Sequence, residues 1–378
     1  MQRSRVYLDA GGSQPLSRRV ADALAAGIAD GWADPTRLST ESRRSRALLE
    51  GSREAIADVL GTRPEHIHFL PSPHLAFERV IAGIVAARRG SDRIIVGATE
   101  RDALMDAAHA AVGDAVETIP VDIHGHVDAD ALEAAVGVPG VALAAVQHAN
   151  QEIGTIQRLD RIADITASAA VPLLVDATAS IGHIDPPSRW DALVGHAADW
   201  GGPAGIAFIA TTPRTRWLPV WAGRDGFSPG GVNVALALAA AVALQEREEL
   251  RSETDARLRR LVDTVRDGVS TLDGIDLVGD PHERLPHVLT FSCLYADGET
   301  LVSELDRVGF AIGSGSACAT GTLEPSRVLA AVGALTHGNV RLSLPPTVTA
   351  ADIDAFLMEL PPALQRIRSR LGAPPAGS

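Results

Sequence analysis

Residues 141–146 have the sequence VALAAV, and residues 173–175 have the sequence LLV. Both runs are short, apolar and bounded by turn-forming residues, and similar runs occur at residues 94–96 and 206–209. Stretches with helical periodicity separate them. This alternation is typical of an α/β domain with a largely parallel sheet, and such domains bind ligands at the carboxyl ends of their strands.

The remaining patterns predict an N-terminal arm and a second, smaller α+β domain. They indicate helices at 17–28, 39–60, 234–272 and 350–371, and strands at 6–8, 288–293, 311–312 and 340–344. The long helix that begins near residue 234 leads into the second group of strands. We therefore expect a large domain over residues 1–235, including the arm, and a small C-terminal domain over residues 236–378.

Composition excludes several classes of protein. The chain has 378 residues and a net charge of -13, so a basic surface for nucleic acid or anionic membranes is not expected. The sequence has no leader pattern and no apolar run that could span a bilayer, and we expect a cytoplasmic protein. The two cysteines, Cys293 and Cys318, are expected to be free thiols, with Cys293 in the core.

One segment has the residue types of a metal site. Asp122, His124, His126 and Asp128 alternate around a glycine and could bind zinc. A turn before a helix explains the same pattern more simply, and no metal is predicted.

Several motifs occur in the order known from one family. They are YLDA at 7–10, HANQEIGT at 148–155, LVDA at 174–177, WGGPAG at 200–205, GSGSAC at 313–318 followed by LEPS at 323–326, and NVRLSL at 339–344. On these motifs the chain resembles the cysteine desulfurases of the class V aminotransferase family, which are pyridoxal phosphate (PLP) enzymes of fold type I. The resemblance covers nearly the whole chain. It implies a large domain with a mainly parallel sheet and a smaller C-terminal α+β domain.

The residue that defines the chemistry of that family is missing. Its Schiff-base lysine precedes the Gly-Pro turn and follows a histidine, and the matching residues here are Asp199 and Ala198. A carboxylate can neither form the aldimine nor serve as the amine that moves the α-proton. Because the chain contains no lysine at all, no neighbouring residue can take over.

Other contacts to the cofactor are also lost. Arg101 stands where the family stacks a histidine on the ring, and the phosphate cradle has the sequence PSPH at 71–74, in which proline removes an N–H donor. His196 and Gly231 replace two further phosphate contacts, and Ala179 replaces a glutamine expected at the ring hydroxyl. We therefore predict that no cofactor is bound, although PLP would be the family cofactor.

Four positions keep the residues that the resemblance implies. Asp176 matches the carboxylate that pairs with the pyridine nitrogen, and Asn150 matches an asparagine that lines the ring. Arg341 matches the arginine that binds the substrate carboxylate. Cys318 matches the persulfide-forming cysteine of a loop rich in Gly and Ser. The alternatives are a strand-end cap for Asp176, an ion pair between domains for Arg341 and a relic thiol for Cys318.

These residues predict a pseudoenzyme: a cysteine desulfurase-like protein without covalent PLP or normal desulfurase activity. It would act as a sulfur acceptor or regulatory partner of an active desulfurase or sulfur carrier, and the resemblance implies a homodimer. One alternative is an enzyme that binds PLP or pyridoxamine phosphate non-covalently. Another is a new small-molecule enzyme that uses Asp199, His196 and Arg101 as acid-base groups. We also expect an ion pair between Arg101 and Asp199 to close the vacated pocket, with His196 as the alternative partner of Asp199.

Overall fold

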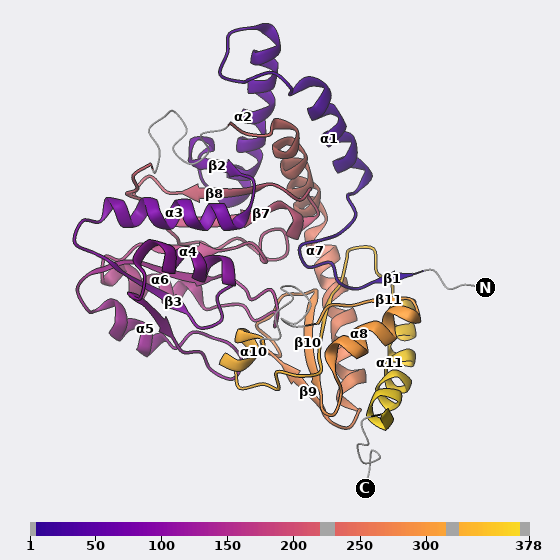
Figure 1. Ribbon diagram of the computed structural model, residues 1–378. Coiled ribbons are helices and arrows are strands. Elements are labelled where there is room, and N and C mark those ends of the chain that lie inside the picture. The colour runs from indigo at the N-terminus through magenta and orange to yellow at the C-terminus, as the bar shows by residue number, and fades with distance from the viewer. Residues whose placement is uncertain (1–4, 220–230, 315–324, 371–378) are drawn as a thin grey trace.

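A seven-stranded sheet forms the centre of the computed structural model, which describes residues 5–219, 231–314 and 325–370 (Figure 1). In spatial order its strands are β2 (Ile67–Leu70), β8 (Ala207–Thr211), β7 (Ala192–His196), β6 (Leu173–Asp176), β5 (Val141–Gln147), β3 (Arg93–Gly97) and β4 (Val116–Ile119). The five strands from β7 to β4 pair in parallel. Only β8 runs antiparallel to its neighbours β7 and β2. The predicted, largely parallel sheet is confirmed.

The two faces of the sheet pack into separate apolar cores. Along β3, Ile94 and Val96 belong to one core, whereas Ile95 belongs to the other, as expected for side chains that alternate across a strand. The first core contains α3 (Pro73–Ala87) and α4 (Asp102–Val112). The second core contains α1 (Arg18–Asp30), α2 (Thr40–Leu60), α5 (Ala129–Val136) and α6 (Leu159–Ser168). Burial on both faces explains why the strand sequences are almost wholly apolar.

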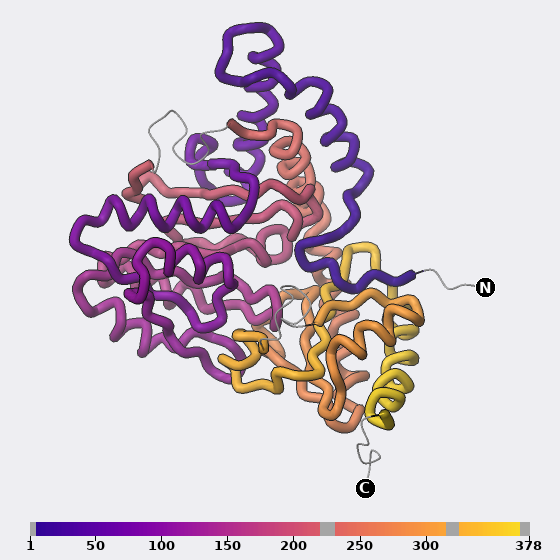
Figure 2. Tube along the Cα trace, viewed as in Figure 1, coloured from indigo at the N-terminus to yellow at the C-terminus, as the bar shows by residue number. Residues whose placement is uncertain are grey.

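A second sheet and its helices form another core at the C-terminal end of the chain. The antiparallel strands are β9 (Ile275–Val278), β10 (Val288–Cys293) and β12 (Asn339–Ser343), and α8 (Gly298–Arg307) and α11 (Ala350–Arg370) pack on them. The N-terminal strand β1 (Val6–Tyr7) pairs in parallel with β11 (Phe310–Ala311), so the indigo start of the tube lies among orange and yellow segments (Figure 2). The two ends of the sequence therefore share one core. The short helices α10 (Arg327–Ala331), η1 (Pro64–His66) and η2 (Ala197–Trp200) complete the described elements.

One long helix, α7 (Val234–Ser270), joins the two parts of the molecule. Its first half contributes residues such as Ala237 and Leu244 to a core of the large sheet, and its second half contributes Leu258 and Val265 to the C-terminal core. Because α7 packs in both cores, the division between residues 235 and 236 stays a prediction. No helix in the described part of the chain is both long and apolar enough to cross a membrane.

Cys293 lies at the end of β10 and is 1% exposed, which confirms the prediction of a core thiol. Burial raises the pKa of this thiol to about 12. Since the thiolate is the reactive form, Cys293 is chemically quiet near neutral pH.

Candidate functional site

The candidate site lies at the carboxyl edge of the large sheet. Asp176 is the last residue of β6, His196 is the last residue of β7, and Asp199 follows in η2. Arg101 is the N-cap residue of α4, a few residues after β3 ends. Parallel strands end at one edge of a sheet, so these residues come together although the sequence separates them by up to about a hundred positions.

Arg101 and Asp176 form a buried ion pair. The Nε atom of Arg101 donates to Oδ2 of Asp176 over 2.6 Å, and the side chains are 17% and 2% exposed. The other carboxylate oxygen accepts hydrogen bonds from the backbone N–H (2.9 Å) and hydroxyl (2.6 Å) of Thr178. Burial opposes the charge on Arg101, but the carboxylates of Asp176 and Asp199 raise its pKa above the usual value. Asp176 therefore both caps the end of its strand and neutralises a cation.

The expected ion pair between Arg101 and Asp199 is wrong. Asp199 instead contacts His196, with 2.7 Å between Oδ2 and Nδ1. The two residues are three positions apart on one tight turn, which places the imidazole within reach without any long side chain. Arg101 instead pairs with Asp176, which is the more deeply buried carboxylate and is therefore stabilised more by a counter-charge. His196, the alternative partner, is the one that the structure shows.

Asn150 is fully engaged within the protein. Its amide nitrogen donates to the carbonyl of Thr99 and to Oε1 of Gln147, both at 3.1 Å. Its amide oxygen accepts from the backbone N–H groups of Glu152 and Ile153, both at 2.8 Å. The asparagine thus organises the turn after β5, a role that its position in the sequence did not reveal.

The first turn of α3 offers few free donors. Pro73 is the first helical residue and has no N–H, and the N–H of Leu75 donates to the hydroxyl of Ser72 over 3.3 Å. A helix N-terminus binds phosphate through N–H groups of this kind. Of the first three helical residues, only His74 keeps an N–H without a capping partner.

Arg341 lies on β12 and faces the N-terminal arm. Its Nη2 atom donates to Oδ1 of Asp9 over 2.9 Å. Arg101 and Arg341 both line a cavity of about 360 Å³ between the sheet edge and the C-terminal core. Sequence reasoning missed three residues that share this cavity, namely Glu152, Ser326 and Arg327. Cys318 lies outside the described residues.

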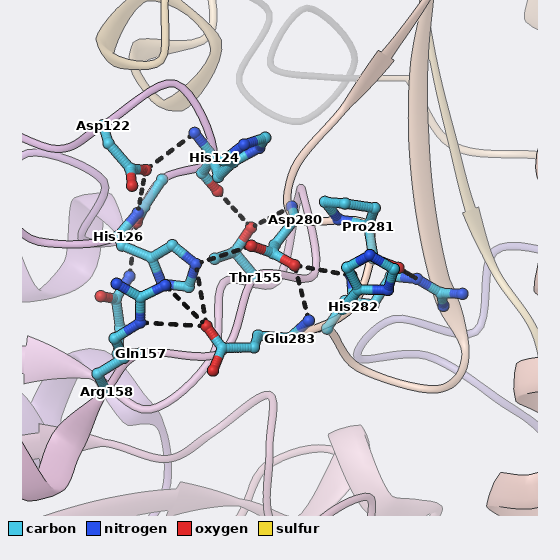
Figure 3. A network of polar contacts seen from close by, with 12 residues as sticks. Asp122, His124, His126, Thr155, Gln157, Arg158, Asp280, Pro281, His282 and Glu283 are labelled. Atoms are coloured by element: carbon cyan, nitrogen blue, oxygen red, sulfur yellow. Dashed lines mark hydrogen bonds and ion pairs between the residues drawn. The ribbon is translucent and has the colours of Figure 1, made fainter.

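The segment with the residue types of a zinc site forms a turn before α5. Oδ1 of Asp122 accepts from the backbone N–H groups of His124 and His126, both at 2.9 Å, and Asp128 caps α5. The Nε2 atom of His126 instead lies 3.0 Å from Oδ2 of Asp280 (Figure 3).

Glu283 completes this network, at 3.6 Å from His126 and 3.0 Å from Arg158 (Figure 3). Burial opposes ionisation of Asp280, but hydrogen bonds from His126 and from two backbone N–H groups lower its pKa to about 2. The network ties the turn at residues 122–128 to residues 280–283. No local signal in the sequence could have paired segments this far apart.

Two stacked histidines, His183 and His287, lie next to Asp199. Nε2 of His183 is 2.9 Å from the backbone carbonyl of Asp199, and Nδ1 is 2.7 Å from Nη2 of Arg247. Because guanidinium can only donate, Nδ1 of His183 accepts and Nε2 carries the proton. The ring of His287 stacks on His183 with 3.7 Å between centroids.

This arrangement predicts a pH dependence of stability. Burial, with repulsion from Arg247, lowers the pKa of His287 from 6.5 to about 3. Between these pH values His287 binds a proton in the unfolded chain but not in the native protein, so the free energy of unfolding falls as the pH falls through this window. We expect His287→Phe, which keeps a ring for stacking, to reduce the slope of unfolding free energy against pH by up to about 1.4 kcal/mol per pH unit.

Urea unfolding across this pH window measures that slope. His337→Gln, at an exposed histidine, should leave the slope unchanged. An unchanged slope in His287→Phe would show that His287 is not responsible for the pH dependence.

The order of the strands in the large sheet and the second, smaller sheet define the class of protein: an α/β fold of the type I PLP-transferase architecture. The family described as aminotransferase class V matches residues 6–217 and 221–356. The chain therefore belongs to the aminotransferase class V family.

Its relatives include cysteine desulfurases. It is 31% identical over 376 residues to "Cysteine desulfurase IscS 1" of Archaeoglobus fulgidus, covering 96% of this chain and 98% of that protein. It is 32% identical over 382 residues to "IscS-like cysteine desulfurase" of Mycobacterium tuberculosis, covering 96% and 97%.

Solved structures share the fold. A "NIFS-LIKE PROTEIN" superposes with a TM-score of 0.86 at 23% identity, covering 97% of this chain and 99% of the other. The apo structure of a cysteine desulfurase from Thermococcus onnurineus NA1 gives a TM-score of 0.84 at 20% identity, covering 96% and 95%. The chain is thus a cysteine desulfurase-like protein in sequence and in fold.

Proposed function

We propose that this cysteine desulfurase-like protein does not hold PLP and has lost normal desulfurase activity, so that it acts as a sulfur acceptor or regulatory partner of an active desulfurase. The observation that carries the proposal is the 2.6 Å contact between Arg101 and Asp176. In the family this carboxylate serves the pyridine nitrogen of the cofactor. Here a side chain of the protein takes that place and supplies the positive charge.

The residues present do not fit PLP. Asp176, which matches the carboxylate that pairs with the cofactor ring, is paired with the guanidinium of Arg101. Asp199 has no amine that could bond to the cofactor aldehyde. Pro73 in the first turn of α3 has no N–H that could donate to the phosphate. Binding the cofactor would require Arg101 to leave a buried partner, which is unfavourable unless a new partner replaces it. These mismatches affect the residues that would contact the ring, the aldehyde and the phosphate of PLP, so a single compensating contact cannot restore cofactor binding.

An absorbance spectrum tests this proposal directly. The purified protein is expected to show no visible band of bound cofactor, before or after incubation with PLP and dialysis. An active desulfurase treated identically provides the positive control. A stoichiometric band that survives dialysis would overturn the proposal and support the alternative of non-covalent PLP.

The sulfur-acceptor role predicts a difference between the two cysteines. Cys318 should take up persulfide sulfur from an active desulfurase, whereas the thiol of Cys293 is buried and its pKa is about 12. Mass spectrometry of Cys318→Ala and Cys293→Ala after transfer separates the two sites. Equal labelling of the two variants would identify Cys318 as a relic thiol.

The same proposal includes a homodimer in the cytoplasm. The dimer is what the resemblance to the cysteine desulfurases implies, and the net charge of -13 gives no support for nucleic acid as a partner. Sedimentation of the purified protein distinguishes a homodimer from a monomer that pairs only with an active desulfurase.

A further inference from the structure

A second cavity, of about 460 Å³, lies at the amino edge of the large sheet. Its walls include Leu173, which begins β6, and Asp191, which directly precedes β7. The same two strands end at Asp176 and His196 in the candidate functional site. Because β6 and β7 are parallel, the cavity and the candidate site lie at opposite ends of these strands.

Positive charge gathers at this cavity although the chain as a whole has a net charge of -13. Four arginines line it, namely Arg88, Arg189, Arg214 and Arg216. Asp191 is the one acidic residue among the described residues that line it, and its Oδ2 already accepts from the backbone N–H of Leu173 over 2.9 Å. Much of the remaining wall is apolar and includes Val171 and Trp190. A concave site with one sign of charge and apolar walls concentrates its electric field on an ion of opposite charge.

Only part of this positive charge is neutralised within the protein. Nη2 of Arg88 donates to the backbone carbonyl of Ala170 over 3.1 Å, and Arg189 forms an ion pair with Asp164. Arg214 and Arg216 form no hydrogen bond or ion pair through their side chains with residues 5–219, 231–314 or 325–370. Within these ranges, one guanidinium group of the four has a carboxylate partner, so the cavity keeps an excess of positive charge.

Hydrogen bonds hold the loop that carries the two unpaired arginines. Arg214 and Arg216 flank Thr215, just after the end of β8. The N–H of Thr215 donates to the carbonyl of Thr212 over 3.0 Å, and the N–H of Thr212 donates to Oγ1 of Thr215 over 3.1 Å. The hydroxyl of Thr215 donates to the backbone carbonyl of Asp191. A ligand therefore does not have to order this turn, which lowers the cost of binding.

We infer that this cavity binds the phosphate groups of a small organic phosphate, held by Arg214 and Arg216. A guanidinium group binds phosphate in bidentate fashion, and the several oxygens of a phosphate can accept from guanidinium groups on different sides. A single carboxylate has two oxygens and one charge, which one arginine can satisfy.

The size and the apolar wall of the cavity agree with such a ligand. A volume of about 460 Å³ is in the usual range for small-molecule sites, and the wall at Val171 and Trp190 suits an organic group attached to the phosphate. The inference goes beyond the proposed function and uses none of the residues that support it.

Calorimetric titration of the dialysed, full-length protein with inorganic pyrophosphate, in the absence of PLP, tests the phosphate site without knowledge of the organic group. We expect saturable binding of one pyrophosphate per chain, weakened by added salt because the contacts are ionic. Succinate, whose two charges lie on separate carboxylates, should bind at least about tenfold more weakly.

Matched variants test the named residues. Arg214→Gln and Arg216→Gln should each weaken pyrophosphate binding by about tenfold or more, because each removes a charged bidentate donor. Arg214→Lys keeps the charge without the planar fork, so its affinity should lie between those of Arg214→Gln and the wild type. Arg260→Gln, at an exposed arginine of α7, is the control and should bind like the wild type. Arg214 and Arg216 are exposed, so the melting temperatures of the variants should stay close to that of the wild type.

If pyrophosphate does not bind, or if Arg214→Gln and Arg216→Gln bind it as tightly as Arg260→Gln does, the inference is wrong. Equal affinity for succinate and pyrophosphate would overturn the assignment of a phosphate ligand. Neither result would change the absorbance test of the proposed function, which concerns PLP at the opposite ends of β6 and β7.

Discussion

Asp176→Asn is expected to lower the free energy of unfolding by about 3–5 kcal/mol, because it leaves the buried guanidinium of Arg101 without its counter-charge. The Asp176 side chain is 2% exposed, so the position of the lost carboxylate is closed to bulk water. The amide oxygen of the asparagine can still accept both hydrogen bonds from Thr178, but its NH₂ group then faces the Nε–H of Arg101, since an amide cannot accept on both sides. Denaturant unfolding of the wild type and the variant measures the difference.

A double-mutant cycle with Arg101→Met isolates the pair itself. We expect the double variant to be more stable than Asp176→Asn, with a coupling energy of about 2–3 kcal/mol. Asp22→Ala serves as the control, because it breaks an exposed pair with Arg18 at 3.8 Å and should cost at most about 0.5 kcal/mol. Additive effects in the cycle would mean that the two charges do not stabilise one another.

The architecture could be predicted because the strands carry their signal locally. The run at 141–146 became β5 (Val141–Gln147), and the run at 173–175 became β6 (Leu173–Asp176). Both are buried on two faces, so nearly every side chain is apolar and the pattern survives without tertiary information. The helix predicted at 350–371 also formed as α11, even though Pro361 and Pro362 lie inside it.

The partners at the site could not be predicted in the same way. The expectation for Arg101 relied on the family positions of two residues and assumed that a missing ring would leave them facing each other. The outcome depended instead on which carboxylate was more deeply buried, and Asp176 at the end of β6 has that position. Likewise, the contact between His126 and Asp280 joins residues that are 154 positions apart, which no spacing rule describes.

The buried polar atoms that lack a hydrogen-bond partner could not be predicted from the sequence, for a related reason. Glu152 lies within the motif at 148–155, and its identity was known, but its lack of a partner on Oε1 is a property of the packed structure. A sequence shows which donors and acceptors exist. Only the fold shows which of them remain unpaired.

Asp199→Lys alone is expected not to restore desulfurase activity. The new amine would lie near Arg101, which would still form its ion pair with Asp176. The first turn of α3 would still lack an N–H group at Pro73. A ring that is not held at its nitrogen and phosphate cannot be oriented for reaction, and misplacement by about 1 Å can cost a hundredfold in rate. We expect sulfide release from cysteine to stay at least about a hundredfold below that of an active relative.

Adding Arg101→His to Asp199→Lys separates the two obstacles. The histidine frees Asp176 and returns the side chain that the family stacks on the ring, so the double variant should bind PLP at least about tenfold more tightly than Asp199→Lys. Absorbance titration with PLP measures this affinity. Asp199→Lys combined with Arg161→His, at an exposed arginine, is the matched control and should show no gain. Normal sulfide release by Asp199→Lys alone would show that the ion pair of Arg101 and Asp176 does not obstruct the cofactor.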